Sequence, residues 1–254
     1  TTALDVTVQA QVLMLLKKLT ERLNMGLLLI THDLGIVQRM ADHVYVMTDG
    51  RLVENNSTDA LFASPSHEYT KHLLAAEPSG KPDPIPEKAR NVLTVNDIKV
   101  WFPIKRGVVR RTIGHIKAVD GISLDLREGH TLGVVGESGS GKSTLGRALL
   151  RLETSVGDIQ FMGCDIQKFG WKEMRPLRRE MQIVFQDPFG SMSPRLSVFQ
   201  IIEEGLMVHG LGGNYGERRN LVRDVLEEVG LDPSNMDRYP HEFSGGQRQR
   251  ICIA

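Results

Sequence analysis

Cysteines, excess charge and long apolar runs are all scarce in this sequence. Its 254 residues include only two cysteines, Cys164 and Cys252, too few for a disulfide framework or a zinc site. Lys and Arg number 31, as do Asp and Glu, so the charge balance gives no general affinity for nucleic acid or for an anionic membrane surface. Apolar runs such as residues 27–30 are far too short to span a bilayer. These absences favour a globular protein of a reducing, cytosolic compartment.

The two ends also lack the signs of a complete chain. The sequence begins with Thr1 rather than Met, and it stops at Ala254 in the middle of a helical pattern. We therefore expect both ends to lie inside a longer protein.

Apolar periodicity divides the chain into two segments, one on each side of a proline-rich stretch at 77–86. In the first segment we expect helices at 8–24, 34–41, 58–63 and 68–76, a buried strand at 27–30, and a hairpin of 43–47 with 51–54. In the second we expect strands at 93–100, 122–126, 132–135 and 183–185, and helices at 143–152, 198–209, 216–229 and from 245 onward. Strands and helices alternate early and helices dominate late, which predicts an α/β core with a helical insertion.

A glycine-rich string carries the strongest chemical signal. Residues 136–143 fit the phosphate-loop pattern G-x-x-x-x-G-K-[ST], with an apolar run before them and a helical pattern after them. Backbone N–H groups of such a loop surround phosphate oxygens, the lysine supplies positive charge and the serine hydroxyl suits Mg²⁺. The predicted nucleotide-binding residues here are Gly136, Glu137, Ser138, Gly139, Ser140, Gly141, Lys142, Ser143 and Thr144.

A second string lies near the end of the chain. Ser244, Gly245, Gly246 and Gln247 open a helical pattern. By itself this string predicts an anion-binding helix start or an ordinary capped helix with a basic face.

Together the two strings resemble the ATP-binding-cassette (ABC) family. The resemblance makes 136–143 the Walker A motif and Ser244–Gln247 the signature motif, which contacts the γ-phosphate held by the opposite subunit. It makes Gln186 the Q-loop glutamine, which senses Mg²⁺ and contacts the membrane partner. It also implies that an aromatic residue stacks on adenine: Phe102, with Trp101 as the alternative and a core position as the plain interpretation.

The first segment resembles the end of such a cassette. Asp5 then corresponds to the D-loop aspartate and His32 to the switch histidine at a strand end, although a core histidine is the plain alternative. The predicted domains are the C-terminal part of one nucleotide-binding domain at 1–77, a linker at 78–91, and the N-terminal part of a second at 92–254. In order, the two parts resemble a circularly permuted P-loop cassette with an antiparallel β subdomain and an α-helical subdomain.

Two further strings narrow the subfamily. Residues 65–70 and 239–242 resemble ATPases of bacterial peptide-type importers with two fused cassettes, of the microcin C, oligopeptide or glutathione kind. The resemblance implies ATP and Mg²⁺ as cofactors. It implies membrane permease subunits, a second cassette of the same chain and, indirectly, a periplasmic solute-binding protein as partners, at the cytoplasmic face of the inner membrane. The rival classes are a cassette that acts on nucleic acid and an inactive piece; the sequence favours transport, without nucleic acid.

One family motif is missing. Walker B is four apolar residues followed by Asp-Glu, and no Asp-Glu pair occurs in these 254 residues; strings 44–49 and 183–187 only imitate it. Because the two acids position Mg²⁺ and polarise the attacking water, we predict negligible ATP hydrolysis by this chain alone, with Lys142, His32 and Asp5 as the catalytic residues that remain. A strand at 27–30 could pair with one at 132–135 and bring His32 near Lys142. In the full tandem protein, by contrast, His32 would meet Ser244, and Lys142 would meet Asp5.

Residues 105–111 form a basic cluster of Lys105, Arg106, Arg110 and Arg111. It is compatible with nucleic-acid or lipid contact, but we expect a solvated hairpin tip near the adenine site.

Overall fold

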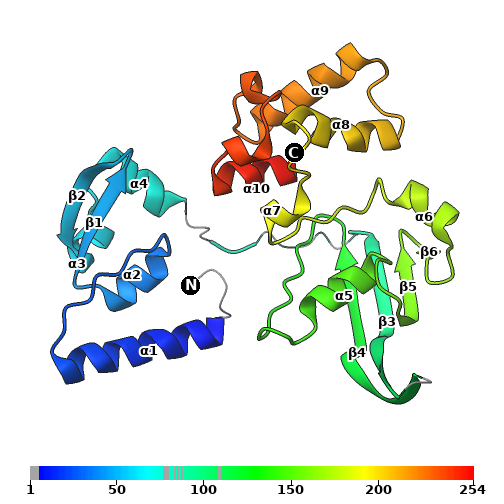
Figure 1. Ribbon diagram of the computed structural model, residues 1–254, viewed down its shortest axis with the longest axis horizontal. Helices are drawn as coiled ribbons and strands as arrows, with labels where there is room; N and C mark the ends of the chain where they lie inside the picture. The colour runs from blue at the N-terminus through cyan, green and yellow to red at the C-terminus, as the bar shows by residue number, and fades with distance from the viewer. Residues whose placement is uncertain (1–5, 77–79, 83, 85, 87, 108–109) are drawn as a thin grey trace. The chain divides into compact units, whose positions relative to one another are not determined.

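The computed structural model describes residues 6–76, 80–82, 84, 86, 88–107 and 110–254 (Figure 1). The chain divides into two compact units, residues 1–163 and 164–254. Each unit is considered by itself.

The first part of the first unit is a small α/β group. Helix α1 (Val6–Leu23) and helix α2 (Leu34–Met40) precede strands β1 (His43–Thr48) and β2 (Arg51–Ser57), and helices α3 (Thr58–Ala63) and α4 (Glu68–Ala75) follow. The two strands pair antiparallel. Asp49 and Gly50 both have positive φ, 50° and 72°, as a tight hairpin turn that follows the strand twist requires. The predicted helices and hairpin of this segment are confirmed.

Glu54 fixes the segment before α4 to strand β2. Its buried carboxylate accepts hydrogen bonds from the Ser66 N–H at 2.8 Å and the His67 N–H at 3.0 Å, and from the Ser66 hydroxyl at 2.8 Å. These donors favour the ionised form, so they lower the pKa of Glu54 from 4.5 to about 2, with the Ser66 N–H as the largest cause.

We expect Glu54→Gln to loosen residues 43–75 at neutral pH, because a neutral amide accepts these hydrogen bonds more weakly than a carboxylate. Since the folded-state pKa is the lower one, the stabilisation by Glu54 is complete above pH 4.5 and is lost as the pH falls toward 2. Amide hydrogen exchange of residues 43–75 measures both effects. The exposed Glu68→Gln is the matched control, and equal exchange in the two variants would refute this role for Glu54.

The rest of the first unit is built on an antiparallel sheet with the strand order β4-β3-β5. Its elements are β3 (Asn91–Arg106), β4 (Arg111–Arg127), helix α5 (Lys142–Leu149) and β5 (Val156–Phe161), and the two-residue β6 (Cys164–Asp165) begins the second unit. A bulge between Val95 and Ile98 in the pairing with β4, with Asp97 at φ 50°, keeps both of these side chains on the core face. Helix α5 contacts β3 and β4, and the buried side chains of this group are Val95, Ile98, Val100, Val119, Leu145, Ala148 and Ile159.

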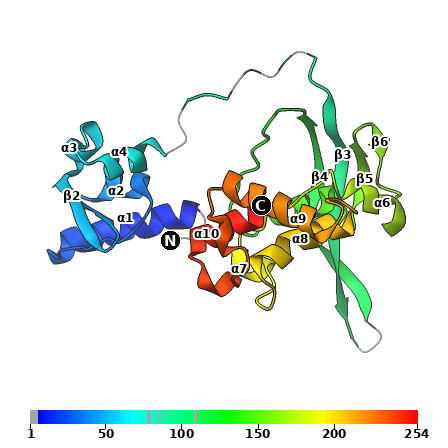
Figure 2. The same ribbon diagram turned by 90° about the horizontal axis from the view of Figure 1, so that it is seen from above.

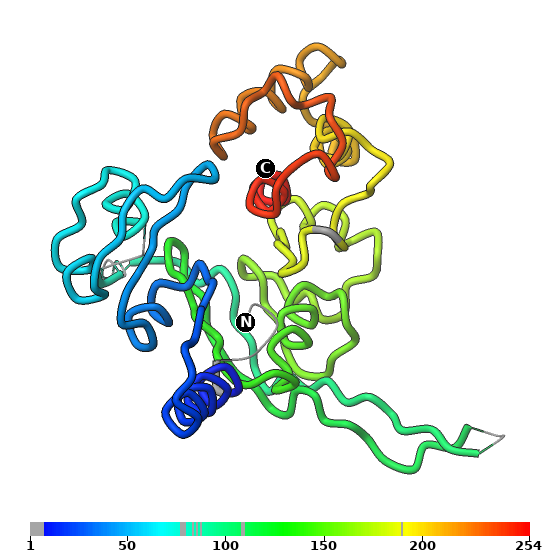
Figure 3. The backbone as a smooth tube through the Cα atoms, turned by 60° about the vertical axis from the view of Figure 1, so that its left-hand side comes forward, coloured from blue at the N-terminus to red at the C-terminus, as the bar shows by residue number. Residues whose placement is uncertain are grey.

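Strands β3 and β4 extend well past their neighbour. Strand β5 pairs with β3 only between Leu93 and Lys99, whereas β4 pairs with β3 as far as Arg106. The outer part of β3–β4 is therefore a two-stranded hairpin, and Figure 2 and Figure 3 show it reaching beyond the end of β5. The predicted strands at 93–100 and 122–126 are confirmed, but both are much longer than predicted.

The second unit is mainly helical. It contains α6 (Trp171–Leu177), α7 (Pro188–Ser191), α8 (Val198–Val208), α9 (Tyr215–Glu228), α10 (Gly245–Ile253), and the 3-10 turns Pro233–Asn235 and Pro240–Glu242. Helices α8, α9 and α10 confirm the helical prediction for this part. Their core consists of Met192, Val198, Phe199, Val222, Leu226, Leu231, Met236, Phe243 and Ile251. A largely buried ion pair between Glu203 and Arg218, 2.8 Å apart, ties α8 to α9.

Three predicted strands are wrong. Residues 27–30, 132–135 and 183–185 are irregular, and none of them pairs with a described strand. Leu28, Ile30 and Val135 are 85%, 88% and 93% exposed. A strand exists only when a neighbour takes up its backbone hydrogen bonds, and apolar composition alone does not supply that neighbour. The pairing of 27–30 with 132–135 that would have brought His32 toward Lys142 is accordingly absent.

Within the described residues, the structure contains no helix that is both long enough and apolar enough to cross a membrane.

Candidate functional site

The loop at 136–143 has a backbone that only glycine adopts readily. Gly136, Gly139 and Gly141 have φ values of 156°, 79° and 94°. The Ser140 N–H donates to the Glu137 carbonyl at 3.2 Å and closes a turn in the loop. A Cβ at Gly141 would overlap the Ala118 carbonyl oxygen of β4, and one at Gly136 would lie 2.8 Å from the Ser140 Oγ. The glycines of the motif thus allow both the turn and its close contact with the sheet.

Lys142, the first residue of α5, turns its ammonium back into this loop. Its Nζ donates to the carbonyl oxygens of Gly136 at 2.8 Å and Glu137 at 2.6 Å, and it lies 3.3 Å from the Ser140 Oγ. Among the described residues, no carboxylate forms an ion pair with Lys142. The loop therefore holds an unneutralised cation at the N-terminal end of a helix, which suits a polyphosphate.

The side chains at the start of α5 fit the same use. Ser143 is exposed in the first turn, where its hydroxyl is accessible to a metal ion bound with a nucleotide, and Thr144 is half-buried beside it. Two turns of α5 then bury Leu145 and Ala148 against the sheet. This packing fixes the direction in which the helix presents its N-terminus.

Strand β4 supports the phosphate loop from below, although none of its residues belongs to the loop motif. The Ala118 carbonyl and the Val119 side chain lie against the position of Gly141, so β4 forms the floor of the loop. The sequence predicts a strand only at 122–126, so the fold was needed to show that β4 extends to Val119 and supports the loop.

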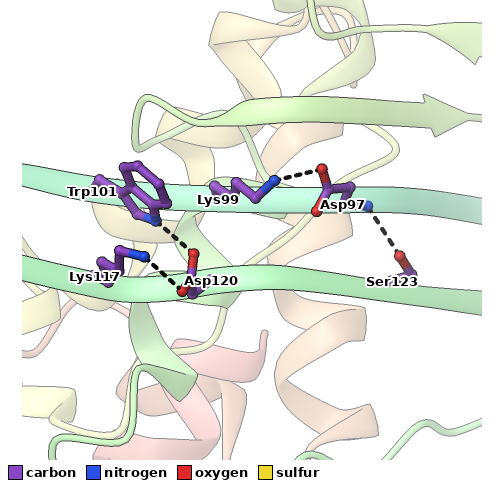
Figure 4. A network of polar contacts seen from close by, with 6 residues as sticks. All are labelled: Asp97, Lys99, Trp101, Lys117, Asp120 and Ser123. Carbon is purple, nitrogen blue, oxygen red and sulfur yellow. Dashed lines mark hydrogen bonds and ion pairs between the residues drawn. The ribbon is translucent and has the colours of Figure 1, made fainter.

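Phe102 and Trp101 lie on opposite faces of β3. Val100 pairs with Val119 on the buried face, and Phe102, two residues further along β3, shares that face. On the other face, the Trp101 Nε1 donates to Asp120 at 3.0 Å, and Lys117 lies 4.3 Å from the indole centroid (Figure 4). An open groove of about 480 Å³ borders both aromatics; its lining residues are Lys99, Val100, Trp101, Phe102, Pro103, His115 and residues 153–156. Phe102 is the better adenine candidate, because it shares a face with the floor of the loop.

The signature string is a capped helix start in the second unit. The Ser244 Oγ accepts from the Gln247 N–H at 3.3 Å, and the Gln247 Oε1 accepts from the Ser244 N–H at 2.9 Å. Gly245 and Gly246 are exposed, and a Cβ at either would meet nothing within 4 Å. The first turn of α10 thus presents an open glycine surface behind a reciprocal cap.

The turn before this cap is held by Glu242. Its carboxylate accepts from the Tyr239 N–H at 2.7 Å and from the Arg238 Nε at 3.3 Å. The Tyr239 N–H, the largest cause, and Arg238 lower the pKa of Glu242. In the Tyr-Pro-His-Glu string at 239–242, Glu242 thus stabilises the turn that leads into the cap at Ser244.

The remaining predicted site residues lie in several places. Gln186 is exposed in a bend just before α7. His32 is exposed. On either side of it, the Thr31 Oγ1 accepts a hydrogen bond from the Asp33 N–H, and Asp33 caps the N-terminus of α2. The described geometry therefore does not support the alternative of a buried core histidine. Asp5 lies outside the described residues.

Comparisons with known proteins bear on the whole arrangement. The family described as ABC transporter matches residues 119–254. All of the chain aligns at 58% identity with 46% of the peptidoglycan transport ATP-binding protein YejF of Agrobacterium fabrum (strain C58). It aligns at 45% identity with 45% of the glutathione import ATP-binding protein GsiA of Salmonella typhimurium (strain LT2). The chain thus spans about half the length of the curated relatives it matches.

Solved structures agree on the fold. The ATP-binding cassette MJ0796, in a dimeric post-hydrolysis state bound to ADP and Pi, matches with a TM-score of 0.54 and 25% identity over 63% of this chain and 67% of that one. The cbiO1 protein of Clostridium perfringens matches with a TM-score of 0.51 and 26% identity over 64% and 59%. This chain belongs to the ABC transporter family.

Proposed function

We propose that this chain is part of the ATP-binding subunit of a bacterial importer, which couples ATP binding and hydrolysis to the import of peptides or related small solutes. The observation that carries the proposal is the loop of residues 136–143, in which Lys142 lies without a carboxylate partner at the start of α5. The names of two relatives, which indicate peptidoglycan transport and glutathione import, support the substrate class. Saturable binding of Mg-ATP by the purified chain, weakened roughly 100-fold in Lys142→Ala, is the result expected.

The loop residues would contact different parts of Mg-ATP. Backbone N–H groups of 137–143 would surround the phosphates, Lys142 would neutralise the β- and γ-phosphates, and the Ser143 hydroxyl would hold Mg²⁺. Gln186 keeps the role of the Mg²⁺-sensing Q-loop glutamine that the family resemblance implies. Phe102 would stack on adenine. Bound Mg²⁺ would supply charge neutralisation between the β- and γ-phosphates.

The other motif residues would act at ATP sites shared with the other cassette. Ser244, Gly245, Gly246 and Gln247 would contact, through the open first turn of α10, the γ-phosphate held by the opposite cassette, and His32 would act at that same ATP site. Asp5 would act at the other ATP site, together with Lys142. The exposure of Gly245 and Gly246 and the exposure of His32 support these assignments.

We infer the partners from the resemblance to importer ATPases. They are integral-membrane permease subunits, a second cassette of the same chain and, indirectly, a periplasmic solute-binding protein; nucleic acid is not among them. This places the subunit at the cytoplasmic face of the bacterial inner membrane.

The 254-residue chain by itself is expected to hydrolyse ATP negligibly, because its sequence contains no Asp-Glu pair to position Mg²⁺ and polarise water. Steady-state phosphate release from the purified chain should not exceed that of Lys142→Ala. Substantial release from the unmodified chain that disappears in Lys142→Ala would contradict this expectation.

A further inference from the structure

The outer hairpin of β3 and β4 concentrates positive charge in an otherwise neutral chain. Between Asp97 and Asp120 the sequence contains no acidic residue, but it contains three lysines and three arginines. Charge segregation of this kind gives one part of the surface a strong positive potential although the net charge is zero.

The cations at the base of the hairpin are neutralised, and those at its tip are not. Lys99 pairs with Asp97 at 2.6 Å and Lys117 with Asp120 at 3.2 Å, both in the network of Figure 4. Lys105, Arg106, Arg110 and Arg111, called the tip cations below, are exposed, and no described carboxylate forms an ion pair with them.

Two tip cations are placed directly against each other. Arg106 and Arg111 are register partners across the β3–β4 pair. Like charges in directly opposed positions destabilise a strand pair, so this arrangement has a local cost that a bound anionic surface would remove.

Exposed aliphatic side chains accompany these charges. Ile104 is 41% exposed, and Ile113 and Ile116 are each 60% exposed. They lie on the part of the hairpin that has no third strand, and Figure 3 shows this part projecting past the sheet. Cationic groups beside exposed aliphatic ones are typical of surfaces that lie in the headgroup region of a bilayer.

We propose that the outer hairpin binds the surface of a membrane containing anionic phospholipid, with the tip cations on lipid phosphates and the isoleucines at the acyl boundary. The inference rests on the proposed function, which puts the chain beside a membrane. Nucleic acid offers the same phosphates, but its sequence-tolerant readers stack bases on aromatic rings, and the described tip residues between Ile104 and Ile113 include none.

The test is co-sedimentation of the whole chain with vesicles of phosphatidylcholine alone or with 30% phosphatidylglycerol. We expect binding only to the anionic vesicles, weakening as salt is raised. Each cation near such a surface contributes about 1 kcal/mol, so the quadruple variant Lys105→Gln, Arg106→Gln, Arg110→Gln, Arg111→Gln should bind on the order of 1000-fold more weakly. The pair Ile104→Ser, Ile113→Ser should weaken the binding that remains at high salt.

A matched control removes the same charge elsewhere. Lys17, Arg22, Lys168 and Lys172 are exposed, and their change to Gln should leave vesicle binding within a few fold of the unmodified chain. Equal losses in the two quadruple variants would overturn the proposal, as would tighter binding to single-stranded RNA than to the vesicles in the same buffer. Mg-ATP binding by the tip variant should be unchanged, so a failure of nucleotide binding is recognised separately from a failure of lipid binding.

Discussion

Replacing Lys142 with alanine is expected to weaken Mg-ATP binding by roughly 100-fold, because a charge-assisted hydrogen bond to phosphate contributes up to about 3 kcal/mol. The Nζ already points into the loop, where it donates to the Gly136 and Glu137 carbonyls. A nucleotide would therefore meet a positioned cation rather than one that must be recruited. Isothermal titration calorimetry with Mg-ATP measures the change directly.

The matched control is Lys172→Ala, which removes an exposed lysine of α6. Its affinity for Mg-ATP should equal that of the unmodified chain. Thermal melts without nucleotide check that loss of the hydrogen bonds made by Lys142 has not unfolded the loop. An unchanged dissociation constant in Lys142→Ala would show that ATP, if it binds, binds elsewhere.

Replacing Gly141 with alanine is expected to destabilise the part of the chain around α5 by about 3 kcal/mol or more. Gly141 has φ 94°, which alanine adopts only with strain, and the added Cβ would overlap the Ala118 carbonyl. The backbone of β4 cannot yield without disturbing its pairing with β3. Urea unfolding in a Trp171→Phe background, with Trp101 on β3 as the fluorescent reporter, measures the loss.

Gly146 supplies the internal control for this substitution. Gly146 lies within α5, whereas Gly141 is the N-cap of that helix. The φ of Gly146 is not positive, and a Cβ there would meet nothing within 4 Å. Gly146→Ala should thus be neutral or stabilising by about 0.5–1 kcal/mol. If the two alanine variants unfolded at the same urea concentration, the account of the loop backbone would be wrong.

Features that depend on neighbouring residues in sequence were predictable. Local residue types determine three of these features: helix α5 after the phosphate loop, the cap at Ser244 and the turn at Asp49–Gly50. The antiparallel pairing of β3 with β4 was also within reach, because both strands alternate apolar and polar residues.

Features that depend on residues distant in sequence were not predictable. The apolar runs at 27–30, 132–135 and 183–185 have the composition of buried strands, yet no described strand pairs with them. The contact of β4 with Gly141 and the separation of Phe102 from Trp101 by strand faces likewise required the fold. Strand pairing, unlike capping or turn formation, cannot be inferred from one segment alone.

The central claim is that this chain binds Mg-ATP through residues 136–143, and a thermal melt with and without Mg-ATP tests it most directly. A ligand that prefers the folded chain adds about 2.7 kcal/mol at one hundred times its dissociation constant, so the melting temperature should rise with ATP concentration. The same addition should stabilise Lys142→Ala by only about 0.4 kcal/mol, because its dissociation constant is roughly 100-fold higher. A melting temperature of the unmodified chain that does not respond to saturating Mg-ATP would contradict the account.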